Sequence, residues 1–166
     1  TCALPISPTL IRNDGRGRFD DVSSLAGTYF ESNMLGRAVG AADFDNDGDL
    51  DLAVTHLDRP VALLRNETTT NRDWIGLSLS SPTRIRPCGG KVELIQGDHR
   101  EVRHLWDGGS YYSSSDERVV LGLPQKGPFS VQVTWPDGRH EEYESLRPNQ
   151  YWVIRPGLAP RSWSEE

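Results

Sequence analysis

The stretch AADFDNDGDLDLAV, residues 41–54, is the most informative part of this sequence. Aspartates occupy every second position in it: Asp43, Asp45, Asp47, Asp49 and Asp51. Neighbouring carboxylates repel one another, so a compact loop must either expose them to water or neutralise them with a cation. Calcium is bound by oxygen ligands from short loops, and Gly48 permits the sharp turn that points successive side chains inward. The pattern therefore predicts a Ca²⁺ loop, and a solvated acidic turn is the alternative.

The spacing of the loop resembles the start of an EF-hand without completing one. An EF-hand needs a bidentate Glu at its twelfth position, and that position here is Val54, inside an apolar strand pattern. An EF-hand is therefore excluded. We expect Asp51, at position 9, to supply the missing carboxylate. Asp49, at position 7, is expected to offer its backbone carbonyl and to leave its side chain in water.

Composition narrows the class of protein. The 166 residues are 36% hydrophobic and 25% charged, which is ordinary for a globular chain. The net charge is −6, and the 18 Lys and Arg residues are scattered among 24 acids, which argues against a nucleic-acid partner. No apolar run approaches the about 20 residues that a transmembrane helix needs, so membrane insertion is not expected. The opening TCALPISPTL is not typical of a signal peptide, and we expect the chain to be an excerpt of a longer protein or a mature chain.

Short apolar runs with a period of two predict an all-β fold. In FSVQVTW (129–135), Phe129, Val131, Val133 and Trp135 share one face of the strand, which is typical of a half-buried antiparallel strand. The other strands are expected at 50–55, 61–65, 74–79, 91–95, 100–106, 118–122, 139–144 and 151–155. LIRNDG (10–15) and LLRNET (63–68) form a partial internal repeat at a spacing near one propeller blade, although chance similarity would also explain it.

The polar stretch NETTTNRD (66–73) is the predicted boundary between two units. We expect a repeat region with the calcium loop over residues 1–68 and a second β domain over 69–157. Residues 158–166 lack a periodic pattern and are expected to be a frayed tail.

The calcium loop, with the preceding GRAVGAADF (36–44), resembles the FG-GAP or VCBS repeat of β-propellers. The resemblance covers about residues 36–66, and DFDNDGDLDL is its specific signal. It implies a propeller-blade-like unit, here the last blade of a propeller. It also implies calcium ligands at loop positions 1, 3, 5, 7 and 9, which are Asp43, Asp45, Asp47, the Asp49 carbonyl and Asp51.

The rest of the chain resembles the ASPIC/UnbV domain, which follows FG-GAP repeats in cartilage acidic protein-like and bacterial secreted proteins. The matching elements, in order, are Trp74, the glycine pair before Val92, REV (100–102), Gly109 with Tyr111, Gly122 with Leu123, WPDG (135–138), and Asn149 with Gln150. The pattern predicts an antiparallel β-sandwich or barrel-like domain. Where the family has an AIGA-like segment, this chain has RPCGG (86–90), which leaves the role of Cys88 open. A Cys2–Cys88 disulfide would suit an oxidising compartment, and two simple thiols are the alternative.

No residue pattern in the chain indicates catalysis. The histidines lack metal-binding spacing, and Ser113–Ser115 lack a nucleophile context. In WDGGSYY (106–112), Trp106, Tyr111 and Tyr112 could form a surface that binds a protein or a glycan, although a packed turn with a buried Trp106 is the commoner arrangement.

We therefore expect a non-catalytic, calcium-binding module for adhesion or for protein or glycan contacts. Its location is expected to be extracellular, at the cell surface or periplasmic. The alternatives are an accessory role in secondary metabolism of the enediyne type, which the UnbV resemblance suggests, and a purely structural propeller cap.

Overall fold

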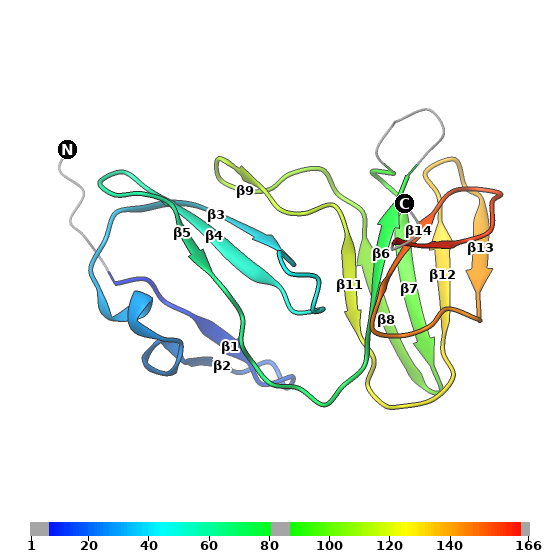
Figure 1. The fold of residues 1–166 in the computed structure, drawn as a ribbon, viewed down its shortest axis with the longest axis horizontal. Coiled ribbons are helices and arrows are strands. Elements are labelled where there is room, and N and C mark those ends of the chain that lie inside the picture. Colours follow the sequence, from blue (N-terminus) through cyan, green and yellow to red (C-terminus); the bar gives the residue numbers. More distant parts are fainter. Residues whose placement is uncertain (1–6, 81–86, 164–166) are drawn as a thin grey trace.

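The computed structural model describes residues 7–80 and 87–163. These residues form two groups of β-strands that lie side by side along the long axis of the molecule (Figure 1). The helical elements of the described residues are two short 3-10 turns, η1 (Ser23–Leu25) and η2 (Thr28–Glu31). The expected all-β class is therefore confirmed.

The N-terminal group contains a hairpin and a three-stranded sheet. The hairpin pairs β1 (Ile11–Asn13) with β2 (Phe19–Asp21). The antiparallel sheet runs in the order β3 (Gly36–Ala42), β4 (Asp51–His56) and β5 (Ala62–Leu64). The aspartate loop, residues 43–51, connects β3 to β4, and Ala42 pairs with Asp51 at its base. The sheet thus has three of the four strands of an ordinary propeller blade.

The C-terminal group is built from two four-stranded sheets and a small hairpin. The first sheet has the order β11 (Val119–Gly122), β6 (Trp74–Leu79), β14 (Tyr151–Ile154) and β15 (Arg161–Ser162). The second has the order β13 (His140–Tyr143), β12 (Ser130–Thr134), β7 (Lys91–Gln96) and β8 (His99–His104). The hairpin joins β9 (Gly109–Ser110) and β10 (Ser113–Ser114). Pairing in both sheets is antiparallel except between β14 and β6, which run parallel.

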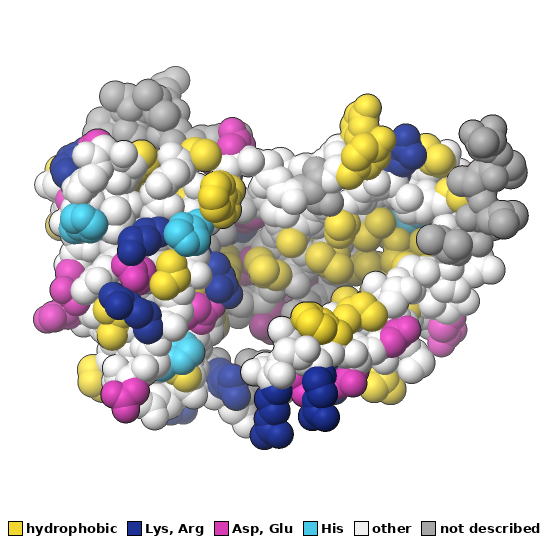
Figure 2. Space-filling view, turned by 180° about the vertical axis from the view of Figure 1, so that it is seen from behind, with side chains coloured by type: hydrophobic (Ala, Val, Ile, Leu, Met, Phe, Trp, Pro, Cys, Tyr) yellow, Lys and Arg dark blue, Asp and Glu magenta, His cyan; other side chains and the backbone are white. Residues whose placement is uncertain are grey.

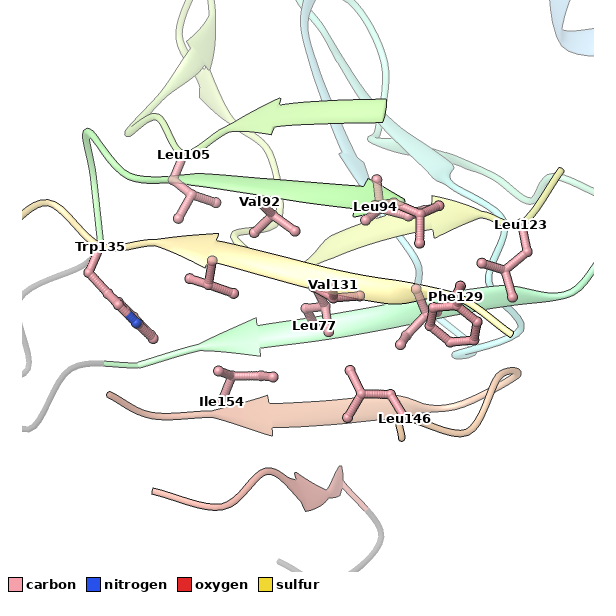
Figure 3. Close-up of a cluster of buried hydrophobic side chains, with 13 residues drawn as sticks. Leu77, Val92, Leu94, Leu105, Leu123, Phe129, Val131, Trp135, Leu146 and Ile154 are labelled. Carbon is pink, nitrogen blue, oxygen red and sulfur yellow. The ribbon is translucent and has the colours of Figure 1, made fainter. Parts of the chain in front are cut away.

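The hydrophobic core lies between these two sheets (Figure 3). Val131 and Val133 are fully buried and Trp135 is 2% exposed, so the predicted inward face of this strand is confirmed. Across the strand pair, Val131 lies opposite Leu94 in β7. Each such side chain contributes about 1.5–3 kcal/mol by leaving water. The core holds Ile75, Leu77, Val92, Leu94, Leu105, Leu121, Leu123, Phe129, Val131, Val133, Trp135, Leu146 and Ile154.

The structure adds strands that the sequence pattern did not indicate. β3, with the sequence GRAVGAA, consists mainly of small residues with low β-propensity. β1 and β2 are exposed throughout, so their residues show no buried face. The segment expected to be a frayed tail contains β15, in which Ser162 pairs with Trp152 of β14. A short edge strand of two residues cannot show periodicity in a sequence.

Candidate metal centre

The backbone of the aspartate loop is shaped by two residues with positive φ. Asn46 has φ 60° and Gly48 has φ 94°. Asn is one of the few residues besides glycine that adopts the left-handed region readily, whereas a φ near 94° strongly favours glycine. These turns fold the loop back on itself above the β3–β4 pair.

The loop brings three carboxylates together. Ligand oxygens of Asp43, Asp45 and Asp51 all lie within 4.8 Å of one another. Asp43 at the start of the loop is 1% exposed and Asp51 at its end is 2% exposed, because the ends of β3 and β4 hold both against the body of the protein. Asp45, at the third position, is exposed to solvent. The predicted proximity of positions 1, 3 and 9 is therefore present in the structure.

Hydrogen bonds fix the two buried carboxylates. Asp43 accepts from the backbone N–H groups of Asp47 at 3.1 Å and Gly48 at 2.9 Å. Asp51 accepts from the N–H groups of Phe44 at 3.0 Å and Asn66 at 2.7 Å. These donors set the side-chain orientation of both residues while leaving their negative charge in place. The carboxylates at the two ends of the loop are thus positioned in advance for a cation.

The two other aspartates point elsewhere. Asp47 is outside the cluster of three, and its Oδ1 accepts from the N–H of Asp49 at 2.9 Å. Arg65, just after β5, lies 2.7 Å from Asp45 and 3.9 Å from Asp47. Burial, followed by repulsion from the neighbouring carboxylates, raises the pKa of Asp49. The proposed roles of the Asp47 carboxylate and the Asp49 carbonyl as ligands stay predictions.

The donor set fits a hard divalent cation. Within the described residues, neither Asp43 nor Asp51 forms an ion pair with a basic side chain, although both are almost fully buried. A buried carboxylate is strongly destabilising unless it is paired or coordinates a metal. All the candidate ligands are oxygens, which suit magnesium, calcium or manganese rather than softer metals. The cluster can therefore hold a metal ion of this class.

Comparisons with known families match both parts of the chain. The FG-GAP-like repeat pattern matches residues 7–54, which include the whole aspartate loop. The ASPIC and UnbV pattern matches residues 83–161. The chain carries an FG-GAP-like repeat followed by an ASPIC/UnbV domain. In the structure, the ASPIC/UnbV sandwich also includes β6, which precedes the matched range.

The chain is also similar to curated relatives over its greater part. It is 34% identical to cartilage acidic protein 1 of Homo sapiens over 110 residues, which is 63% of this chain and 17% of that protein. Cartilage acidic protein 1 of Xenopus tropicalis is 32% identical over the same length and the same shares. The aligned part of the chain thus spans about a sixth of the length of these relatives. Among the described residues, no helix is long and apolar enough to cross a membrane.

The ASPIC/UnbV domain contacts the aspartate loop of the repeat directly. The Tyr151 hydroxyl donates to Asp43 Oδ2 at 2.7 Å. Burial, with the adjacent Asp43 carboxylate, raises the pKa of Tyr151 well above its usual range, so the hydroxyl keeps its proton and acts as the donor. The Arg118 guanidinium donates to the Asp43 carbonyl oxygen at 2.6 Å and to Asn46 Oδ1 at 2.5 Å. The sequence gives no signal for these partners, because 75 and 108 residues separate them from Asp43.

A hollow separates the two groups of strands on the face seen in Figure 2, and hydrophobic side chains line its floor. Beside the loop, the repeat and the domain together line an open cleft of about 910 Å³. Asp47, Asp49 and Arg65 line it from the repeat, and Trp74 and Asn149 line it from the domain. The outward carboxylates of the loop therefore face open space, whereas Asp43 and Asp51 do not.

The predicted aromatic surface is exposed. Trp106 is 75% exposed, Tyr111 60% and Tyr112 82%, so the alternative of a packed turn with a buried Trp106 does not hold. The rings of Tyr111 and Tyr112 meet edge to face at 4.6 Å, and the Arg37 guanidinium lies 5.4 Å from the Tyr111 ring. Trp106 instead lies 5.8 Å from the ring of His104.

The predicted disulfide is only half within the described residues. Cys88 is exposed, and its thiol has no disulfide partner in the described part of the chain. Cys2 lies outside that part. The Cys2–Cys88 bridge stays a prediction.

Proposed function

We propose that this chain is a calcium-binding, non-catalytic module of an extracellular protein, and that it presents a surface to a protein or glycan ligand. One observation carries the proposal: the carboxylates of Asp43 and Asp51 are buried beside Asp45, and within the described residues neither carboxylate forms an ion pair with a basic side chain. Arg65 pairs with Asp45, and a divalent ion would supply the positive charge that the two buried carboxylates lack. Asp43, Asp45 and Asp51 would hold it, together with Asp47 and the Asp49 carbonyl as the remaining expected ligands.

Calcium is the ion that the loop suits best. Magnesium demands near-ideal octahedral geometry, whereas calcium accepts an irregular set of carboxylate, carbonyl and water oxygens. The exposed Asp45 leaves room for water at the same site. The carboxylates of Asp43 and Asp51 are held by backbone N–H groups, which suits retention of an ion rather than activation of a nucleophile. This supports a structural ion and a non-catalytic role.

Calorimetric titration of the full chain tests the metal assignment. Calcium should bind at one site per chain, and magnesium should bind more weakly, because it demands near-ideal octahedral geometry. Asp45→Asn should weaken calcium binding. Asp20→Asn should not, because Asp20 is an exposed acid on β2 that pairs with Arg12, away from the loop. Absence of calcium binding to the unaltered chain would refute the proposal.

The aromatic residues at the β9–β10 hairpin support the interaction surface. Tyr and Trp are enriched in binding hot spots because they bury a large area at low entropic cost. Tyr111 and Tyr112 are exposed at the hairpin, and the Arg37 guanidinium lies over the Tyr111 ring. Peptide and glycan arrays should yield a ligand whose binding is lost in Tyr112→Ala. Phe19→Ala is the matched control, because Phe19 is a 66% exposed aromatic on β2.

The extracellular setting is supported by the name of the relatives, which refers to cartilage, a tissue that consists mostly of extracellular matrix. Millimolar extracellular calcium would fill even a weak site. A structural cap is the second candidate, because residues 113–116 cover the edge of β3. The Asp116 N–H donates to the Ala41 carbonyl at 2.8 Å, and the Ser113 hydroxyl donates to the Val39 carbonyl at 2.6 Å. Arrays without any ligand would favour the cap.

A further inference from the structure

We infer that the ASPIC/UnbV domain is part of the calcium site, with Tyr151 as a positioning residue for Asp43. Binding of the ion and docking of the domain onto the repeat are therefore coupled. This inference rests on the proposed calcium function. It assigns a role to residues of the second domain that no aspartate pattern indicates.

Tyr151 reaches the centre of the loop from the first strand position of β14. Its side chain is 3% exposed and Asp43 is 1% exposed, so the hydrogen bond between them is shielded from water. The oxygen that Tyr151 contacts, Asp43 Oδ2, also accepts from the Gly48 N–H. Two donors on one oxygen fix the carboxylate in one orientation. Partners of this kind, behind the ligands themselves, orient the ligands and commonly change metal affinity by about 10- to 100-fold.

Arg118 provides a second link between Asp43 and the ASPIC/UnbV domain. It is held by Asp116, whose Oδ2 accepts from Arg118 Nε at 2.6 Å. Its guanidinium then contacts Asn46 and the backbone of Asp43, while its carbon lies 4.5 Å from the centre of the Tyr151 ring. The guanidinium is thus held between the loop and Tyr151. Arg118 is suited to this position because a planar fork can donate in several directions while it stacks on a ring.

Trp74 closes the loop from its other side. A Cβ atom at Gly48 would lie 2.2 Å from the Trp74 ring, so the loop backbone packs directly on the indole. The Trp74 ring in turn meets the Tyr151 ring at 5.2 Å. The loop therefore rests on an aromatic platform of the domain, and its conformation depends on the position of that platform.

Binding of the ion and docking of the domain are coupled because both involve Asp43 and the loop backbone. If docking orients Asp43 for the ion, the ion binds the docked form more tightly than the undocked form. Linkage then requires that the ion favour docking by the same factor. Calcium should accordingly affect residues of the ASPIC/UnbV domain that do not contact the loop.

Tyr151→Phe in the full chain tests the positioning role. The ring and its contacts with Trp74 remain, and only the hydroxyl is lost. We expect calcium affinity, measured by calorimetry, to fall by about tenfold or more. Tyr143→Phe is the matched control, because its hydroxyl donates to the Glu141 carboxylate at 2.8 Å inside the same domain. Unchanged affinity in Tyr151→Phe overturns the inference and leaves the calcium function standing, whereas an unaltered chain that does not bind calcium overturns both.

Hydrogen exchange tests the coupling independently of affinity. The Asp116 amide belongs to the domain and donates to the Ala41 carbonyl of the repeat, across the contact between domain and repeat that we call the joint. The Trp135 amide donates to the Arg139 carbonyl within the sandwich. Calcium should slow exchange at Asp116 by a larger factor than at Trp135. Tyr151→Phe should reduce this difference. Equal effects of calcium on both amides in the unaltered chain would overturn the coupling.

Arg118→Lys completes the test with an internal control. Arg139 sits in a turn of the same design, in which its N–H and Nε donate to Asp137 as those of Arg118 donate to Asp116. Among the described residues, Arg139 pairs with Asp137 and not with the loop. Arg118→Lys should abolish the calcium-dependent protection of the Asp116 amide, and Arg139→Lys should preserve it. Full protection in Arg118→Lys would contradict the role of Arg118 in the joint.

Discussion

Gly48→Ala should destabilise the protein more than a change from glycine to alanine at any exposed turn. Gly48 has φ 94°, and an added Cβ would lie 2.2–2.4 Å from three atoms of the Trp74 ring. Real Cβ atoms do not approach other atoms this closely, so either the loop or the indole must move. The substitution thus combines backbone strain with a steric clash at the joint between the repeat and the domain.

The two effects can be given magnitudes. Left-handed backbone at a residue other than glycine costs about 1–2 kcal/mol. Overpacking of a filled site costs about another 1–3 kcal/mol. The sum is about 2–5 kcal/mol, and each kcal/mol lowers Tm by about 2–4 °C for a chain of this size. We expect a decrease of about 10 °C by calorimetry or circular dichroism.

Gly15→Ala isolates the strain from the clash. Gly15 has φ 76°, and nothing lies within 4 Å of a Cβ built there, so only strain of about 1–2 kcal/mol should appear. In a Trp74→Leu background, the effect of Gly48→Ala should fall toward that of Gly15→Ala, because the ring is gone. If Gly48→Ala and Gly15→Ala are equally mild in the unaltered background, the loop does not pack on Trp74 and the reasoning fails.

Three further predictions concern the domain and the cysteines. Leu94→Ala should destabilise by about 2–5 kcal/mol in denaturant unfolding, whereas Leu158→Ala, at a 56% exposed position, should change stability little. A hydrogen bond from Lys91 lowers the pKa of Glu93 against the effect of burial, so Glu93 contributes stability above its ordinary pKa and loses it as pH falls through the lowered value. Acid titrations of stability should therefore be flatter in Glu93→Gln. Alkylation without reductant, under denaturing conditions, should label both Cys88 and the second cysteine or neither; a single label would contradict the intramolecular bridge.

Much of the fold is encoded locally and could be predicted. The strand at 129–135 alternates apolar and polar residues because one face meets the core, and Val131 and Val133 are buried as expected. The loop could be recognised because carboxylates on alternate positions with Gly48 have few other physical explanations. β3 escaped detection because its small residues carry little hydrophobic contrast, and its position follows from pairing with β4.

The joint could not be predicted, because its contacts join residues far apart in the sequence. In the sequence, Tyr151 is one aromatic residue of an apolar strand pattern, and no neighbouring residue indicates that its hydroxyl contacts Asp43. From the sequence, Arg118 would be predicted to be an exposed charged residue near Asp116. The exposure of Trp106 could not be decided from the sequence either, because large aromatic residues are usually well buried, yet this side chain is 75% exposed. Only tertiary packing determines these three outcomes.

Thermal unfolding with calcium and with a chelator tests the central claim most directly. At a calcium concentration about 100 times the dissociation constant, a native-state site stabilises the protein by about 2.7 kcal/mol. The unaltered chain should therefore melt at a higher temperature in calcium. Asp51→Ala should lose most of this gain, because a buried carboxylate of the cluster is removed. Asp49→Ala should keep most of it, because only its carbonyl is expected to bind. Coincident melting curves with and without calcium, or equal damage from Asp49→Ala and Asp51→Ala, would contradict the calcium site as assigned.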